Sequence, residues 1–300
     1  MNVVIKAFKI GWSNIKKNWV YCLYRYTGND YRYDVKIMTI DQTLNYMAIP
    51  GNSIVRYGDG EFMLMCGGDI GNYQSADAEL ASRLRTILQK KQESLLVCLP
   101  EPFCGVDNYI RRSQKHWILH NKETRNQYQE LLDSSYTYGN SFVSRPYLIY
   151  EDKTKSAAWF DRLKGLFANK DITIIEGCYS RTGVGNDLFN GIKSIERIIC
   201  PPNNAFQKYN KILEATNVIS KDRMVLVALG PTGKLLTADM VERGYWVLDI
   251  GHIDSEYEWF LMKATKKVSI NNKHTAEHNS DSFDECTDEN YLASIICRIE

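Results

Sequence analysis

Apolar segments in the second half of the chain constrain its fold more than any other feature. Each is a nearly continuous apolar run, and these runs alternate with segments that have the spacing of an amphipathic helix. The runs are "DITIIEG", "ERIICPP", "MVLVALG" and "YWVLDIG". Strands that are apolar on both faces occur in parallel sheets covered by helices on both sides. The sequence therefore predicts an α/β, Rossmann-like fold with a mostly parallel sheet.

The connecting segments complete this prediction. Helices are expected at "VGNDLFNGIKSI", "FQKYNKILEAT" and "TGKLLTADMVERG". In the first half, "NSIVRYG" and "SLLVCLP" are predicted strands, and "SADAELASRLRTILQKKQ" and residues 109–132 are predicted helices. We expect one domain over residues 36–300, with a polar C-terminal tail at 271–290 that is either a lid or a surface segment.

Composition excludes several classes of function. With 300 residues and 44% hydrophobic content the chain can bury a proper core, and its net charge of +1 gives no overall field that would favour nucleic acid. The eight cysteines form no C-x-x-C pair, which favours buried reduced thiols over disulfides or a zinc site. We therefore expect a cytoplasmic protein that binds no nucleic acid.

The N-terminal segment, residues 1–35, mixes basic residues with aromatic and aliphatic ones. It contains no apolar run of about 18 residues, the length that spans a membrane. Two interpretations stay open for it. One is a helix that lies on an anionic membrane surface, which would make the protein peripheral on the inner face of the plasma membrane. The other is an ordinary helix docked on the core.

Polar residues follow the predicted strands where those strands end. The clearest groups are Gly58–Glu61, Glu176–Gly177, Pro201–Asn204, Gly230–Gly233 and Gly251–Glu256. Ligands of open parallel sheets bind beyond the carboxyl ends of the strands. We therefore expect a binding site there.

Asp59 and Glu61 are the first candidates for function in this site. They are two residues apart, so extended backbone would place both carboxylates on one side, and Gly58 and Gly60 would let the chain turn beneath them. Carboxylates together with a diphosphate suit Mg²⁺ or Mn²⁺. The alternative is a solvated turn after a strand.

Two strand ends have features of anion sites. "GPTGKLL" places Gly230, Pro231 and Thr232 at a predicted helix start, where backbone N–H groups and the helix dipole favour phosphate. "SRTGVGND" adds Arg181, which can pair with a diphosphate in forked geometry. Neither segment has the spacing of a Walker loop or of a dinucleotide-binding loop, so NAD is unsupported.

Two histidine patterns resemble zinc-protease strings. "HWILH" contains His116 and His120 but lacks the required Glu, and "HTAEH" with His274 and His278 stands in a polar tail. We interpret all four as surface histidines.

Several long blocks together resemble the bacterial GT-D-fold glycosyltransferases. They occur in order between about Ile40 and about Phe260, with a segment on each side outside the match. The blocks are "SIVRYGDGEF", "FVSRPY", "IIEGCYSRTGVGNDLF", "RIICPPNNAF", "LVALGPTGKLLTADMVERGY" and "LDIGHIDSEYEWF". Gly233 and Lys234 depart from the pattern, in which we expect small apolar residues.

The resemblance implies a single-domain enzyme, a hexosyltransferase that moves a sugar from a UDP-sugar, of glucose or galactose type, to a glycan acceptor. That acceptor would be lipid-linked or protein-linked and would belong to a cell-surface polysaccharide or glycoprotein. The family's D-x-E metal motif falls on Asp59 and Glu61, which would hold Mn²⁺ or Mg²⁺ against the donor diphosphate.

The resemblance and the strand ends together give a candidate site. His252, Asp254 and Glu256 would line the reacting centre, with Asp254 as the first candidate for a base in an inverting reaction. Arg145 would either bind donor or acceptor or brace a loop. The predicted nucleotide-sugar-binding residues are Arg56, Arg145, Glu176, Arg181, Asn186, Gly230, Pro231 and Thr232.

Two other classes of function compete with an enzyme. One is a non-catalytic partner that binds nucleotide sugar or glycan for another transferase. The other is a membrane-surface scaffold, for which Asp59→Asn would be harmless. The density of carboxylates at the strand ends favours the enzyme.

Overall fold

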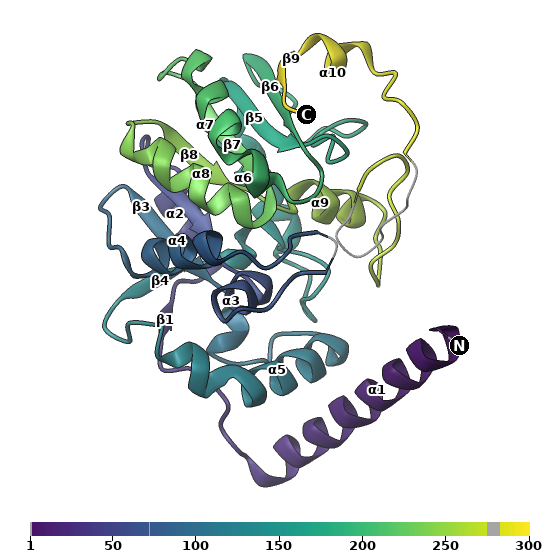
Figure 1. The fold of residues 1–300 in the computed structure, drawn as a ribbon. Coiled ribbons are helices and arrows are strands. Elements are labelled where there is room, and N and C mark those ends of the chain that lie inside the picture. Colours follow the sequence, from purple (N-terminus) through teal and green to yellow (C-terminus); the bar gives the residue numbers. More distant parts are fainter. Residues whose placement is uncertain (1, 72, 275–282) are drawn as a thin grey trace.

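In the computed structural model, the predicted parallel sheet is confirmed (Figure 1). The structure describes residues 2–71, 73–274 and 283–300, with backbone alone for 2–13. Within these residues nine strands form one parallel sheet of order β1-β4-β3-β2-β8-β7-β5-β6-β9. The strands are β1 Lys36–Ile37, β2 Ser53–Arg56, β3 Leu95–Leu99, β4 Thr137–Asn140, β5 Asp171–Gly177, β6 Ser194–Cys200, β7 Met224–Ala228, β8 Trp246–Asp249 and β9 Ile295–Arg298.

Helices cover both faces of the sheet, as right-handed crossovers between parallel strands require. The connections containing α4, α7 and α8 run in one direction across the sheet and those containing α2 and α6 in the other, so the two groups lie on opposite faces. The helices are α1 Asn2–Thr27, α2 Ile40–Met47, α3 Asp59–Met65, α4 Ala78–Gln89, α5 Arg111–Gln129, α6 Ser156–Phe167, α7 Tyr209–Ala215, α8 Gly230–Glu242, α9 Ile253–Leu261 and α10 Glu289–Ala293.

The middle of the sheet forms the core and positions the site. Every residue of β2, β3 and β7 is buried, which explains the apolar runs in the sequence. Strand β2 pairs with β8, with Ile54 opposite Leu248, although the two are far apart in sequence. The loops that leave β2 and β8 at their carboxyl ends therefore lie side by side.

One predicted helix is wrong. Residues 178–193, between β5 and β6, form a series of turns and contain no helix. Gly183, Gly185 and Gly191 have φ values of 81°, 79° and 83°, in the left-handed region that interrupts a right-handed helix. Apolar spacing alone does not reveal this, because Leu188 and Phe189 are buried from turns just as they would be from a helix.

Both ends of the chain add to the predicted picture. Helix α1 packs along α5 at the lower edge of the molecule (Figure 1), with Val20 buried between the helix and the core. At the other end, β9 extends the sheet beside β6, a strand that the sequence analysis did not predict. Within the predicted tail, residues 275–282, including His278, lie outside the described residues. No described helix is both long enough and apolar enough to cross a bilayer.

Candidate active site

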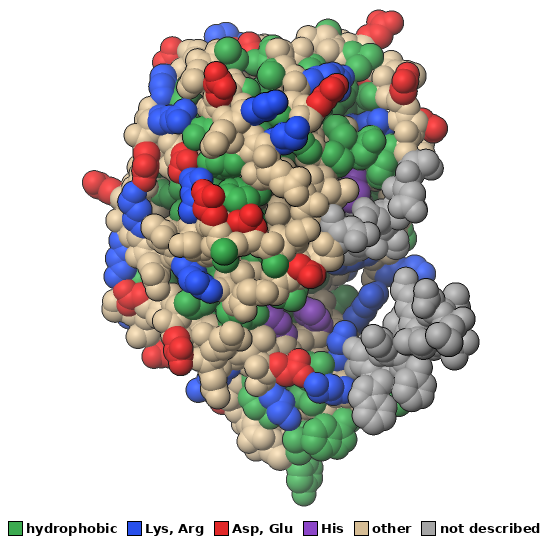
Figure 2. Space-filling model, viewed as in Figure 1, with side chains coloured by type: hydrophobic (Ala, Val, Ile, Leu, Met, Phe, Trp, Pro, Cys, Tyr) green, Lys and Arg blue, Asp and Glu red, His purple; other side chains and the backbone are tan. Residues whose placement is uncertain are grey.

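A cleft of about 1070 Å³ opens over the carboxyl ends of β2, β7 and β8. The loops after these strands form one wall, with Asp59, Gly230 and His252 among the lining residues. The start of α5 and part of α1 form the opposite wall. The space-filling view shows a hollow between the α/β body and these lower helices (Figure 2). The cleft thus lies where parallel α/β sheets bind their ligands.

Asp59 is the most accessible acidic group in this cleft. It is the first residue of α3, and 52% of its side chain is exposed. Its Oδ2 lies 3.5 Å from Nε2 of His116 on α5. Partial removal of the carboxyl group from water opposes its ionisation, but the contact with His116 and the charges of nearby basic groups outweigh this and hold the pKa of Asp59 below its usual range. Asp59 is therefore a carboxylate, able to hold a cation.

Glu61 is held differently from Asp59. The prediction that both carboxylates lie on one side of extended backbone is wrong. The two residues stand in the first turn of a helix and not in extended backbone, so they do not point to the same side. Glu61 Oε2 accepts a hydrogen bond of 2.8 Å from the backbone N–H of Gly58 and so caps the start of α3. Its Oε1 lies 3.5 Å from Nζ of Lys234, and only 11% of the side chain is exposed.

The two carboxylates fit a divalent cation only together with a bound diphosphate. The described residues hold no cluster of three or more His, Cys, Asp or Glu side chains that could bind a metal unaided. Mg²⁺ is commonly held by one or two carboxylates, substrate phosphates and water. Asp59 fits this role through its exposed carboxylate, whereas Glu61 lines the cleft with one oxygen at Gly58 N and the other facing Lys234.

Arg56 lines the cleft, but its guanidinium group braces the surrounding loops. Its Nε donates to the carbonyl oxygen of Asp249 at 2.7 Å, and its Nη2 lies 3.2 Å from Asp249 Oδ1. Its Nη1 donates to the carbonyl of Ser141 and to the hydroxyl of Ser144. Gly251 passes so close that a Cβ there would lie 1.7 Å from Arg56. Arg56 therefore holds the loops around the cleft in place.

The start of α8 lies at the cleft, where Gly230 can offer a backbone N–H but Pro231 has none. Gly230 and Pro231 line it, the first turn contains no acidic residue, and no side chain caps the helix. Gly230 has a φ of 51°, and a Cβ there would lie 2.5 Å from the ring of Tyr73. Since no acidic or capping side chain competes there, the positive end of the helix dipole favours a phosphate beside Gly230. Thr232, by contrast, is fully buried and does not line the cleft.

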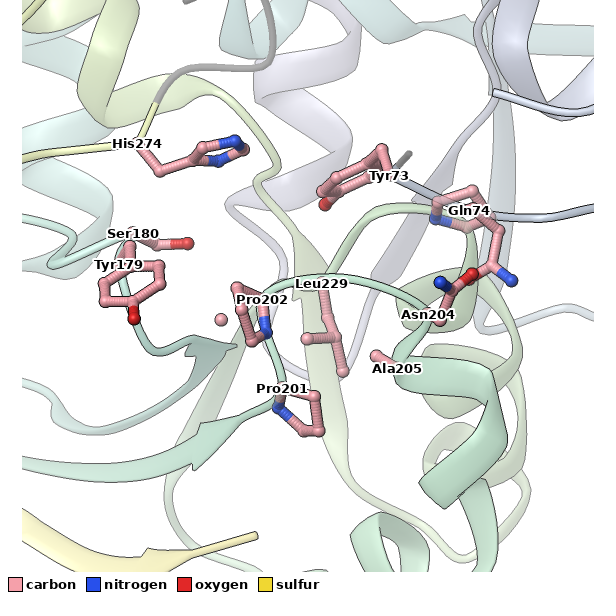
Figure 3. Close-up of a pocket in the computed structure, with 12 residues that line it drawn as sticks. Tyr73, Gln74, Tyr179, Ser180, Pro201, Pro202, Asn204, Ala205, Leu229 and His274 are labelled. Atoms are coloured by element: carbon pink, nitrogen blue, oxygen red, sulfur yellow. The ribbon is translucent and has the colours of Figure 1, made fainter. Parts of the chain in front are cut away.

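A narrow pocket branches from the cleft next to α8 (Figure 3). Tyr73, Ser180, Pro231 and His274 line both spaces. The rings of Tyr73 and His274 are nearly parallel, with centroids 6.1 Å apart, and Pro201 and Pro202 also line the pocket. Its free space of about 20 Å³ admits a water-sized group, so a larger ring would lie at its mouth.

The three predicted catalytic residues occupy different environments. His252 lines the cleft and is half-buried. Asp254 also lines it, but its carboxylate accepts hydrogen bonds from Gly183 N, Asn186 Nδ2 and Lys273 Nζ, each at 2.8 Å. Burial raises the pKa of Asp254, against the opposing effect of Lys273.

Glu256 is fully buried and accepts a hydrogen bond from the backbone of Leu148. It does not line the cleft. Of the three predicted catalytic side chains, His252 is therefore the best placed to meet a substrate.

Four predicted donor-binding residues lie outside the cleft lining: the buried Thr232, and Glu176, Arg181 and Asn186. Glu176 forms a buried ion pair with Arg197 and accepts from Thr182 N. Arg181 donates to the backbone carbonyls of Asn272 and Asp284, and Asn186 donates to Asp254 and Glu258. These side chains connect the loops around the site to one another and do not line the cleft. Arg145 lines the cleft, which is compatible with both of its predicted roles.

Several cleft residues were not predicted from the sequence. His116, interpreted as a surface histidine, contacts Asp59. The sequence gives no local signal for this contact, because Asp59 and His116 stand in helices that are far apart in the chain. Other lining residues, such as Tyr73 and Lys266, follow no strand end and carry no motif.

Comparison with known proteins gives consistent matches. A family model described as "Glycosyltransferase GT-D fold" matches residues 54–278. A "Probable glycosyl transferase Gly" from Streptococcus gordonii is 45% identical over 88% of this chain, and a "Glycosyltransferase GlyD" from Streptococcus pneumoniae serotype 4 is 43% identical over the same share. The chain spans only 39% and 33% of the lengths of these two relatives.

Solved structures agree with these matches. One, of a domain of unknown function 1792 described as having a distinct glycosyltransferase fold, is 45% identical with a TM-score of 0.85, over 89% of this chain and 96% of that one. Another, described as a new glycosyltransferase from Streptococcus sanguinis, is 44% identical with a TM-score of 0.84, over 89% of this chain and all of that one.

Proposed function

The chain belongs to the GT-D family of glycosyltransferases, and we propose that it transfers a hexose from a UDP-sugar to a glycan acceptor with the help of a divalent cation. The observation that carries the proposal is the shared cleft of Asp59 and the open start of α8. A carboxylate that can hold a cation and a helix N-terminus that can bind phosphate suit the two ends of a metal–diphosphate group.

The proposed donor pose follows from this pair. The diphosphate lies between Asp59 and Gly230, and the base of the nucleotide lies at the mouth of the pocket beside Tyr73 and His274 (Figure 3). Aromatic rings and prolines there offer flat apolar surface for a base to stack on. Mn²⁺ or Mg²⁺ held by Asp59, with Glu61 beside it, would stabilise the charge that develops on the diphosphate.

A side chain of the protein would then remove the proton of the acceptor hydroxyl. The bond between the anomeric carbon and the diphosphate breaks, and its electrons leave with the diphosphate. The acceptor hydroxyl forms the new bond and releases its proton. We assign the removal of that proton to His252, because it lines the cleft while Asp254 is held by three donors and Glu256 is buried.

Calorimetric titration of UDP into the purified protein, with and without Mn²⁺, tests the donor assignment. We expect binding that strengthens by at least about tenfold when the cation is added, since the cation bridges two negatively charged partners. Hydrolysis of a UDP-sugar in the absence of acceptor would then identify the sugar. A folded protein that binds no UDP under either condition would exclude the UDP-sugar donor.

We also propose that α1 contacts an anionic membrane surface. Ile15, Trp19 and Tyr26 are exposed on the helix, while Val20 on another face is buried. Exposed apolar side chains on one face of a basic helix are typical of a helix that lies in a membrane interface.

Sedimentation with vesicles tests this contact. The protein should bind phosphatidylglycerol vesicles more strongly than phosphatidylcholine ones, and the double variant Ile15→Ser, Trp19→Ser should lose about tenfold in affinity because less apolar surface enters the lipid. The matched variant Val218→Ser, at an exposed apolar residue near α7, should bind like the wild type. Equal binding by all three proteins would contradict the proposed role of α1.

A further inference from the structure

We propose that the outer part of the cleft is a second phosphate-binding site, which holds a phosphate group carried by the acceptor. This inference rests on the proposed function, because it assigns the acceptor's chemical class at the same cleft. We call this part the basic mouth. Its residues are Lys17, Arg111, Arg112, Lys115, Lys266 and Lys267.

The charges of the cleft are divided between its two parts. The acidic residues that line it among the described residues are Asp59, Glu61 and Asp254, all in the inner part where the strands end. The inner part has three cations: Arg56 and Lys234, which are paired with Asp249, and Arg145. The excess of positive charge therefore lies in the basic mouth, although the whole chain has a net charge of only +1.

Three separate elements supply the basic mouth. Lys17 comes from α1, Arg111 and Lys115 come from α5, and Lys266 comes from the segment after α9. Figure 2 shows Lys and Arg side chains along the edge of the hollow, on both of its sides. Cations that converge from three elements on one cleft raise the local concentration of anions there. A single basic helix exposed to solvent would not converge in this way.

Contacts between α1 and α5 hold part of this arrangement in place. The guanidinium carbon of Arg111 lies 5.5 Å from the ring centroid of Tyr21, within the range of a cation–π interaction. The Nζ of Lys115 donates a hydrogen bond to Asn18. Both partners belong to α1, so the docking of that helix orders the wall of the basic mouth.

The backbone adds to the side chains at the start of α5. No side chain caps this helix of 19 residues, and its first turn contains no acidic residue. Arg111, Arg112 and Ser113 of that turn line the cleft. Open N–H groups next to two guanidinium groups and a hydroxyl suit the oxygens of a phosphate, which accept several hydrogen bonds in a small volume. This chemistry favours a phosphate over an acidic peptide, whose carboxylates are spread along a chain.

The spacing along α5 separates this site from the donor site. His116, which contacts Asp59 at 3.5 Å, stands four residues after Arg112 on the same face of the helix. Four residues rise by about 6 Å along the helix axis. A phosphate at Arg112 would therefore lie about one sugar ring away from the proposed cation site. An acceptor in which a sugar is joined directly to phosphate would fit, with its sugar near the donor.

The test measures binding of glucose 1-phosphate and methyl glucoside to the protein saturated with UDP and Mn²⁺. Presaturation keeps the phosphate probe out of the donor site. We expect glucose 1-phosphate to bind at least about tenfold more tightly than the uncharged glucoside, because each hydrogen bond between charged groups contributes more than that factor. The double variant Arg111→Ala, Arg112→Ala should lose this advantage. The matched variant Arg85→Ala, Lys211→Ala removes two exposed cations outside the cleft and should keep it.

Each other outcome would overturn the inference. Equal binding of both probes, equal losses in both double variants, or displacement of glucose 1-phosphate by further UDP would exclude a second phosphate site.

Binding of the arginine variant to UDP, measured in parallel, shows whether the donor site is intact and so separates a failure of this inference from a failure of the proposed function. If phosphatidylglycerol vesicles, and not glucose 1-phosphate, bind in an arginine-dependent way, the phosphate belongs to a membrane lipid and the acceptor assignment is wrong.

Discussion

Asp59→Asn is expected to abolish Mn²⁺-dependent UDP binding and to lower the transfer rate at least about 100-fold. The substitution keeps the shape of the side chain and removes the charge that would hold the cation. Since 52% of the Asp59 side chain is exposed, the folded structure should tolerate the change. Calorimetry with UDP and Mn²⁺ measures the binding, and release of UDP from a UDP-sugar measures the rate.

Glu61→Gln separates the two carboxylates of the motif. A glutamine can still accept the hydrogen bond from Gly58 N that starts α3, but it loses the charge that faces Lys234. We therefore expect a smaller loss of cation-dependent binding than for Asp59→Asn. Asp161→Asn, at an exposed position on α6 outside the cleft, is the matched control and should change neither quantity. Equal effects of Asp59→Asn and Asp161→Asn would rule out Asp59 as a ligand of the cation.

The sequence predicts the sheet well because its signal is local. Each buried strand is a short apolar run, so β5, β6, β7 and β8 can be read without knowledge of their neighbours. The edge strand β9 lacks that signal, since its residues alternate between half-buried and exposed. The turns of residues 178–193 were missed because glycine conformations, and not apolar spacing, decide between helix and turn there.

The site is harder to predict because a strand end gives the position of a side chain but not its direction. Asp59 and Glu176 both stand at the carboxyl ends of strands. Asp59 lines the cleft, whereas Glu176 does not line it and pairs with Arg197. The direction depends on partners distant in sequence. Arg197 is 21 residues from Glu176, and Lys273 is 19 residues from Asp254. The residues of α5 face the cleft only because that helix packs beside the strand ends, which no local pattern indicates.

Lys234, which stands where the resemblance predicts a small apolar residue, leads to the second prediction. Its Nζ lies 2.9 Å from Asp249 Oδ2, and the same oxygen accepts the backbone N–H of Arg56 at 3.0 Å. All three residues are buried. Asp249→Ala would leave two buried cations without their shared carboxylate, and we expect the free energy of unfolding to fall by about 3–5 kcal/mol. Urea unfolding with an unchanged m value measures the loss.

Two further variants show whether burial causes this effect. Glu242→Ala removes a carboxylate from an ion pair with Lys90 that is about half exposed, and it should cost less than about 1 kcal/mol. Asp249→Asn keeps the shape and one acceptor oxygen, so it remains measurable even if the alanine variant does not fold. A loss for Asp249→Asn no larger than that for Glu242→Ala would show that the pairing of the buried cations contributes little to stability.

The pH dependence of the stability lost in Asp249→Asn follows from the direction in which folding shifts the pKa of Asp249. Burial opposes ionisation of Asp249, but the charges of Lys234 and Arg56 outweigh it and hold the pKa of Asp249 below its ordinary value. A carboxyl group with a lowered pKa in the folded protein stabilises it above the pKa of the unfolded chain, about 4, and loses that contribution as the pH falls below this value. The stability difference between wild type and Asp249→Asn should therefore be constant from pH 7 to about pH 5 and shrink at lower pH. A difference that stays constant down to pH 3 would mean that the charge of Asp249 is not what stabilises this part of the core.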